Sequence, residues 1–184
     1  MKVYRIRFEV DDFRSLRAKD ASVHEIRLMA FNGSSKVDQW PETLEAVIDN
    51  KRAPVPDIYS CDAGNMLLWG RSLELLRPRV APIAELLPAF WESGEGFVVN
   101  VTSLTGCLDM GRTVWKLAKS TGKRLWITQY AFIKEKVPSS TMFKVKGDNF
   151  SLLCADHEDG SENLLTLVDE HDLDGISFEQ IWES

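Results

Sequence analysis

The 184-residue sequence has few cysteines, no long apolar run, and no lysine or arginine after Lys146. The three cysteines, Cys61, Cys107 and Cys154, are odd in number and far apart, which excludes a disulfide framework and is typical of reduced thiols. No apolar run approaches the roughly 20 residues of a membrane span. The first residues, Met1–Arg7, place charges inside an apolar pattern, unlike a secretory signal. We therefore expect a cytoplasmic protein that makes no membrane contact.

What the chain does contain supports a folded core. Hydrophobic residues make up 44% of the sequence and six of the residues are tryptophan, which excludes a disordered chain. A chain of this length buries roughly 70% of its unfolded surface, so it needs no disulfide bonds or bound metal to fold. We expect one domain, or two small lobes that share an interface.

The charges are strongly segregated along the chain. Residues 1–147 contain all 22 basic side chains and 17 acidic ones, whereas residues 148–184 contain 11 acidic side chains and no lysine or arginine. Either the acids fold against internal cations such as Lys116, Lys119, Lys123 and Arg124, or they form a docking surface for a charged partner. The net charge of −6 argues against nucleic acid as a direct ligand.

Apolar periodicity predicts mainly strands. Residues 2–10 alternate apolar and charged side chains, which is typical of a strand with one buried face. The β-branched run Phe97–Val101 predicts a central strand buried on both faces, whose Asn100 amide needs hydrogen-bond partners. Segment 26–30 also favours a strand, and segment 44–48 favours a strand with a short helix as the alternative. The expected class is α+β, mainly antiparallel sheet with a few short helices and with two lobes as an option.

Two helices and one hairpin complete the expected elements. Helices are predicted near residues 72–79 and 162–171, capped by Ser72 and Ser161. Segments 113–119 and 124–132 flank a glycine-containing turn, which favours a hairpin, with a helix over 114–119 as the alternative.

The segment Gly106–Thr113 has the outline of a phosphate-binding loop, in which two glycines separated by four residues precede a basic residue and a threonine. Arg112 stands where the compact ammonium of lysine is needed, and Asp109 adds a negative charge to a loop that should hold an anion. We interpret this segment as a turn, with a nucleotide-binding or hydrolytic enzyme as the alternative function.

Other chemical groupings in the sequence are incomplete. Cys107, Asp109 and His157 could be written as a thiol triad, but no local signature supports it. The acids and histidines of 156–160 and 170–172 resemble metal ligands, yet their spacing fits neither a calcium loop nor a tight zinc set. We predict no catalytic, metal-binding or cofactor-binding residues.

A set of short motifs does resemble a known family. The motifs are Pro56–Ser60, Met66–Trp69, Leu87-Pro88, Gly96–Val101, Cys107–Asp109, Met142–Gly147 and Leu173–Phe178. In their order and spacing they resemble the eleventh numbered immunity-protein family of bacterial polymorphic-toxin and type VI secretion systems. The resemblance implies a small, non-enzymatic α+β protein that binds and neutralises a cognate toxin.

The resemblance also frames the expected organisation. It covers residues 57–184 as an immunity-protein-like domain, whereas residues 1–50 form a β-rich part, either separate or continuous with it. The expected partner is the toxin, although the chain could also pair with a second copy of itself. For the toxin-binding surface we predict the acids of the C-terminal segment: Asp156, Glu158, Asp159 and Glu162.

Overall fold

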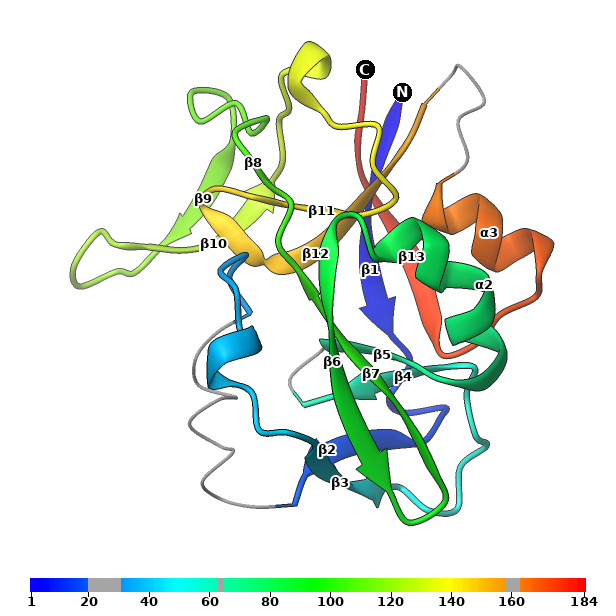
Figure 1. Cartoon of the computed structure of the whole chain (residues 1–184). Helices are drawn as coiled ribbons and strands as arrows, with labels where there is room; N and C mark the ends of the chain where they lie inside the picture. The colour runs from blue at the N-terminus through cyan, green and yellow to red at the C-terminus, as the bar shows by residue number, and fades with distance from the viewer. Residues whose placement is uncertain (20–30, 63–64, 158–162) are drawn as a thin grey trace.

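In the computed structural model, which describes residues 1–19, 31–62, 65–157 and 163–184, the strands form a closed barrel, a five-stranded sheet and a separate hairpin (Figure 1). Most of the strand pairs are antiparallel, and the described residues also form two short α-helices. The predicted α+β class is therefore confirmed. The strand expected at 26–30 lies outside the described residues.

The barrel is built from residues 15–101 in the order β2-β3-β6-β7-β5-β4. Its strands are β2 (Ser15–Ala18), β3 (Leu44–Asp49), β4 (Ile58–Cys61), β5 (Asn65–Leu68), β6 (Ala84–Trp91) and β7 (Gly94–Val101). Val98 points into the barrel core, whereas Val99 and Val101 pack against the helices and the second sheet. The prediction of a strand buried on both faces is thus confirmed. The Asn100 amide donates to the Ser34 carbonyl and to Glu85, at 2.9 and 2.8 Å.

The five-stranded sheet combines the first strand of the chain with the last ones. Its order is β13-β1-β12-β11-β8, from β1 (Lys2–Phe8), β8 (Leu104–Thr105), β11 (Phe143–Val145), β12 (Asp148–Asp156) and β13 (Ile176–Glu183). Because β1 pairs with β12 and β13, and β3 pairs with β6, strands from 1–50 hydrogen-bond to strands from 57–184. Strands from both parts of the chain therefore share the same sheets.

Two helices lie beside the sheets, close to their predicted positions. They are α2 (Gly70–Val80) and α3 (Leu164–Glu170), and two 3-10 turns, η1 (Val37–Gln39) and η2 (Lys134–Lys136), are also present. Within the described ranges, no helix is long and apolar enough to cross a membrane.

The predicted helix caps need correction. Helix α2 begins at Gly70, so Ser72 is its third residue; its hydroxyl donates to the Asp57 carbonyl at 2.6 Å and ties the helix to the segment before β4. Ser161 lies outside the described residues. The N-cap of α3 is Asn163, whose side-chain oxygen accepts a hydrogen bond from the Thr166 amide at 3.0 Å.

The cap gives a testable prediction. Replacing Asn163 by alanine leaves the Thr166 amide without its acceptor, so we expect the free energy of unfolding to fall by about 1 kcal/mol. Serine keeps an acceptor oxygen, so Asn163→Ser should lower the free energy of unfolding by less than Asn163→Ala does. Urea denaturation of both variants measures the difference, and equal losses would show that the cap contributes nothing.

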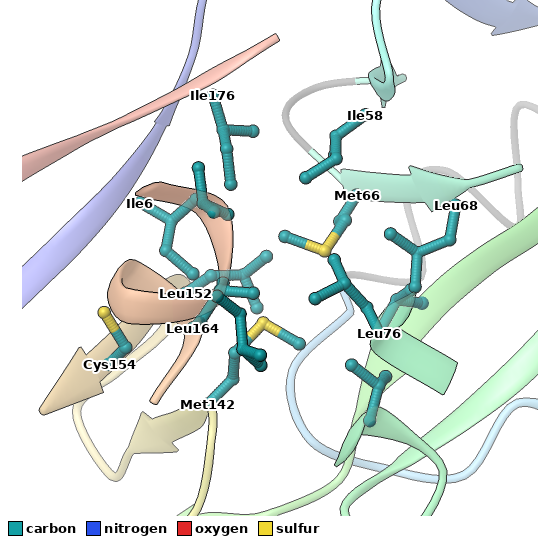
Figure 2. Close-up of a cluster of buried hydrophobic side chains, with 14 of the residues drawn as sticks. Ile6, Ile58, Met66, Leu68, Leu76, Met142, Leu152, Cys154, Leu164 and Ile176 are labelled. Carbon is teal, nitrogen blue, oxygen red and sulfur yellow. The ribbon is translucent and has the colours of Figure 1, made fainter. Parts of the chain in front are cut away.

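The main core lies where the barrel, the five-stranded sheet and both helices meet. Figure 2 shows side chains from all of these elements converging there: Ile6, Ile58, Met66, Leu68, Leu76, Met142, Leu152, Cys154, Leu164 and Ile176. A second cluster fills the barrel, and a third lies between the five-stranded sheet and the segment 107–137. That third cluster positions the surface described next.

Candidate functional site

The predicted hairpin is present as β9 (Val114–Leu117) and β10 (Arg124–Gln129). The turn between the strands is closed by two backbone bonds: Ala118 donates to the Lys123 carbonyl at 2.8 Å, and Gly122 donates to that of Ala118 at 2.9 Å. Gly122 has φ +66°, a conformation that favours glycine. The alternative of a helix over 114–119 was wrong, because the turn pairs the two segments as strands.

The hairpin has one buried face and one exposed face. Trp115 and Ile127 are cross-strand partners that pack into the third hydrophobic cluster, and Ile127 is buried. Lys116 and Trp126 form the neighbouring pair and are both exposed, because adjacent strand residues point to opposite faces. The inner face therefore holds the hairpin in place while the outer face remains accessible.

A polar network secures the base of the hairpin. Just after β10, the Tyr130 ring stacks on Phe132, and the Arg5 guanidinium donates to the Tyr130 oxygen at 2.6 Å. The Tyr130 hydroxyl in turn donates to the Asp148 carboxylate. Burial, together with this bond to Asp148, raises the pKa of Tyr130 to about 12, so the hydroxyl keeps its proton near neutral pH. The network connects the hairpin to both β1 and β12.

The hairpin exposes large apolar side chains to water. Trp126 is 57% exposed, and Leu125, Leu117 and Val114 are 51%, 49% and 49% exposed. Single exposed apolar residues are ordinary, but a cluster on one small hairpin is typical of an interaction surface. We call these four residues, with Lys116, Lys119, Lys123 and Arg124, the hairpin face.

The charge on this face is uniformly positive. Residues 111–129 contain five cations and no acid. None of these cations forms an ion pair with an acid in the described ranges; Arg124 instead lies over the Trp115 ring, 5.0 Å from its centre. Among the described residues, the C-terminal acids therefore do not neutralise these cations, contrary to the alternative interpretation of the charge pattern. Glu179, an acid of that segment, pairs with Arg5 and Arg7.

The segment Gly106–Thr113 is the predicted turn. The Asp109 carboxylate accepts hydrogen bonds from the Gly111 and Arg112 amides, at 3.0 and 3.2 Å, and the Thr113 hydroxyl donates to the Asp109 carbonyl at 2.7 Å. These are amides that a phosphate would need. A strand, β9, follows the loop, so the helix N-terminus of a phosphate site is missing from this position.

The components of the hypothetical thiol triad have separate hydrogen-bond partners. Cys107 is fully buried beside the Thr105 hydroxyl, and burial raises the pKa of its thiol. Asp109 binds loop amides, and the His157 ring nitrogen lies 3.0 Å from the Pro138 carbonyl. A protonated, buried thiol without a hydrogen-bonded base is a poor nucleophile.

The acidic segment is described only in part. Glu158, Asp159 and Glu162 of the predicted toxin-binding surface lie outside the described residues. Asp156 is half-buried at the end of β12, opposite Lys2, and accepts a 3.4 Å hydrogen bond from the Asn163 amide. Among the described residues, no three His, Cys, Asp or Glu side chains are placed to hold a metal ion. In Figure 1, the end of β12 lies on the side of α3, away from the hairpin.

A groove of about 570 Å³ runs between β1 and β2. Three arginines line it, but Arg17 pairs with Asp49 at 3.0 Å, and Arg5 and Arg7 both contact Glu179. Its charges are therefore largely matched within the protein, unlike those of the hairpin face.

A scan against protein-family models and a search of the curated proteins found no match to this chain. The hairpin face was also not among the sites that the sequence predicted. Its signal was nonetheless present, because a stretch with five cations, no acid and two tryptophans is rarely buried completely.

Proposed function

We propose that this chain is a non-enzymatic immunity protein that binds and neutralises a cognate bacterial toxin in the cytoplasm. The observation that carries the proposal is the hairpin face, which is anchored on its inner side and combines exposed apolar side chains with cations that form no ion pair with an acid among the described residues. The resemblance of the motifs in 57–184 to the immunity-protein family supports the same function.

The requirements of an inhibitor agree with this surface. Interfaces gain most of their affinity from a few aromatic or arginine anchors, and Trp126 and Arg124 are residues of this kind. A uniformly charged surface accelerates the encounter with an oppositely charged partner, which matters to a protein that must capture a toxin before it acts.

The alternative function, a nucleotide-binding or hydrolytic enzyme, would depend on the Gly106–Thr113 loop. The Asp109 carboxylate occupies two amides of that loop, so an anion would have to displace it. A carboxylate already bound to the loop amides also repels a phosphate.

The proposal predicts protection in cells. A toxin encoded beside this chain should arrest growth when expressed alone, and co-expression of the chain should restore growth because the complex blocks the toxin. Colony counts with each gene under its own inducible promoter measure this. Continued killing despite soluble, folded chain would contradict the proposal. Micromolar ATP or GTP binding that Arg112→Ala abolishes would favour the enzyme instead.

A further inference from the structure

We propose that the hairpin face docks onto an acidic protein surface that contains an apolar pocket for Trp126. This inference rests on the proposed function and specifies which surface acts and what chemistry the partner presents. It replaces the acidic C-terminal segment as the principal contact.

The apolar part of the face indicates a protein partner. Leu117, Leu125 and Val114 are aliphatic and belong to the same small hairpin as Trp126, with about half of each side chain exposed. Aliphatic side chains do not stack on bases, whereas an exposed tryptophan accompanied by aliphatic side chains is typical of a protein interface. A folded partner can supply the pocket that removes these side chains from water.

The charge of the face specifies the sign of the partner. Lys116, Lys119 and Lys123 are exposed and form no ion pair with the described residues, and no acid lies within 111–129. A basic partner would leave these cations facing like charges, which is unfavourable. Carboxylates around the pocket would pair with them at the rim of the interface.

Two other occupants fit less well. Nucleic acid would bind a chain whose net charge is −6. Outside the hairpin, the acidic side chains of the protein would repel its phosphates. A second copy could not place two hairpin faces together, since their cations would repel.

The face is preorganised for docking. Trp115 and Ile127 anchor the inner side of the hairpin, and the Arg5–Tyr130–Asp148 network fixes its base. Trp126 is therefore presented on a fixed strand, and little ordering is needed when the partner binds.

The test uses the full-length chain with a photoreactive phenylalanine at position 126 or, as the control, at Val37, which is 58% exposed on η1. After irradiation in host cells, we expect a protein adduct from position 126 and none from position 37. The adduct should disappear when Lys116, Lys119 and Lys123 are all replaced by glutamate. It should persist when Arg52, Lys134 and Lys136, exposed cations outside the hairpin, are replaced by glutamate instead.

Rates measured with the purified adduct partner sharpen the result. Trp126→Ala should weaken binding about thirtyfold. The triple lysine-to-glutamate variant should slow association about tenfold at low salt and flatten its salt dependence, with an unchanged thermal midpoint. Three results would overturn the inference. They are an adduct with nucleic acid or with a second copy, the absence of an adduct from position 126, and an affinity and association rate that both variants leave unchanged.

The growth assay separates this inference from the proposed function. Variants that still protect against the toxin but carry an altered hairpin face would refute the surface and leave the immunity role intact. A charge-dependent protein adduct without protection against the toxin would support the surface and refute the immunity role.

Discussion

Replacing Gly175 by alanine is expected to lower the free energy of unfolding by more than about 3 kcal/mol. Gly175 has φ +94°, and a Cβ there would lie 2.1 Å from the Ile58 carbonyl oxygen and 2.8 Å from the Pro56 Cβ. Relief would require a backbone shift, because the Gly175 carbonyl accepts from the Glu9 amide and the adjacent Asp174 carbonyl accepts from Ile58. That shift would disturb the junction where β1, β4 and β13 meet.

Gly122 provides the matched control for this prediction. It also has a positive φ, +66°, but a Cβ there would meet nothing within 4 Å. Gly122→Ala therefore tests backbone strain without the clash, and we expect a loss of about 1 kcal/mol. Chemical denaturation of both variants measures the difference. Similar losses at the two positions would show that the close approach of Ile58 to Gly175 is easily relieved.

Replacing Lys144 by methionine is expected to stabilise the protein by about 2 kcal/mol near pH 7. Lys144 is 2% exposed in β11, and its ammonium donates to the Phe31 carbonyl. Burial lowers its pKa to about 8 from 10.5, partly opposed by the Asp148 charge. A pKa difference of this size corresponds to about 3 kcal/mol, against about 1 kcal/mol for the lost hydrogen bond.

The pH dependence gives this prediction its sign. Because the folded pKa is depressed, the native state disfavours the protonated amine, and the full cost is present below about pH 8. Between about pH 8 and 10.5 the unfolded chain holds a proton that the native chain has lost, so the cost disappears as the pH rises. The advantage of Lys144→Met in urea denaturation should therefore be constant up to about pH 8 and shrink between about pH 8 and pH 10.5. A constant advantage would show that Lys144 titrates normally in the folded protein.

Several elements could be predicted from local sequence because their periodicity is unambiguous. The alternation in residues 2–10 predicts β1, and the β-branched run Phe97–Val101 predicts a strand buried on both faces. The helices near 72–79 and 162–171 were found because apolar spacing marks their buried sides. These patterns extend over a few residues, so they can be recognised without knowledge of the tertiary contacts.

Other features depend on contacts that no local pattern encodes. Alternation in Phe143–Lys146 suggests that Lys144 faces water, yet β11 is buried on both sides and Lys146 is the exposed residue. Trp126 has the composition of a core residue, and only the packing of Trp115 and Ile127 decides that it points outward. Barrel closure likewise joins strands that are far apart in the sequence.

The position of β1 has a consequence for the order of assembly during synthesis. Its strand partners, β12 and β13, lie in the last 37 residues, while the barrel needs only residues 15–101. During synthesis β1 must therefore remain unpaired until the much later strands β12 and β13 have been made. Contacts of such sequence separation are slow to form, and unpaired strand edges invite association. Arg5 and Arg7 lie within β1 and keep the unpaired strand charged. Their charge opposes association with other chains until β12 and β13 pair with the strand.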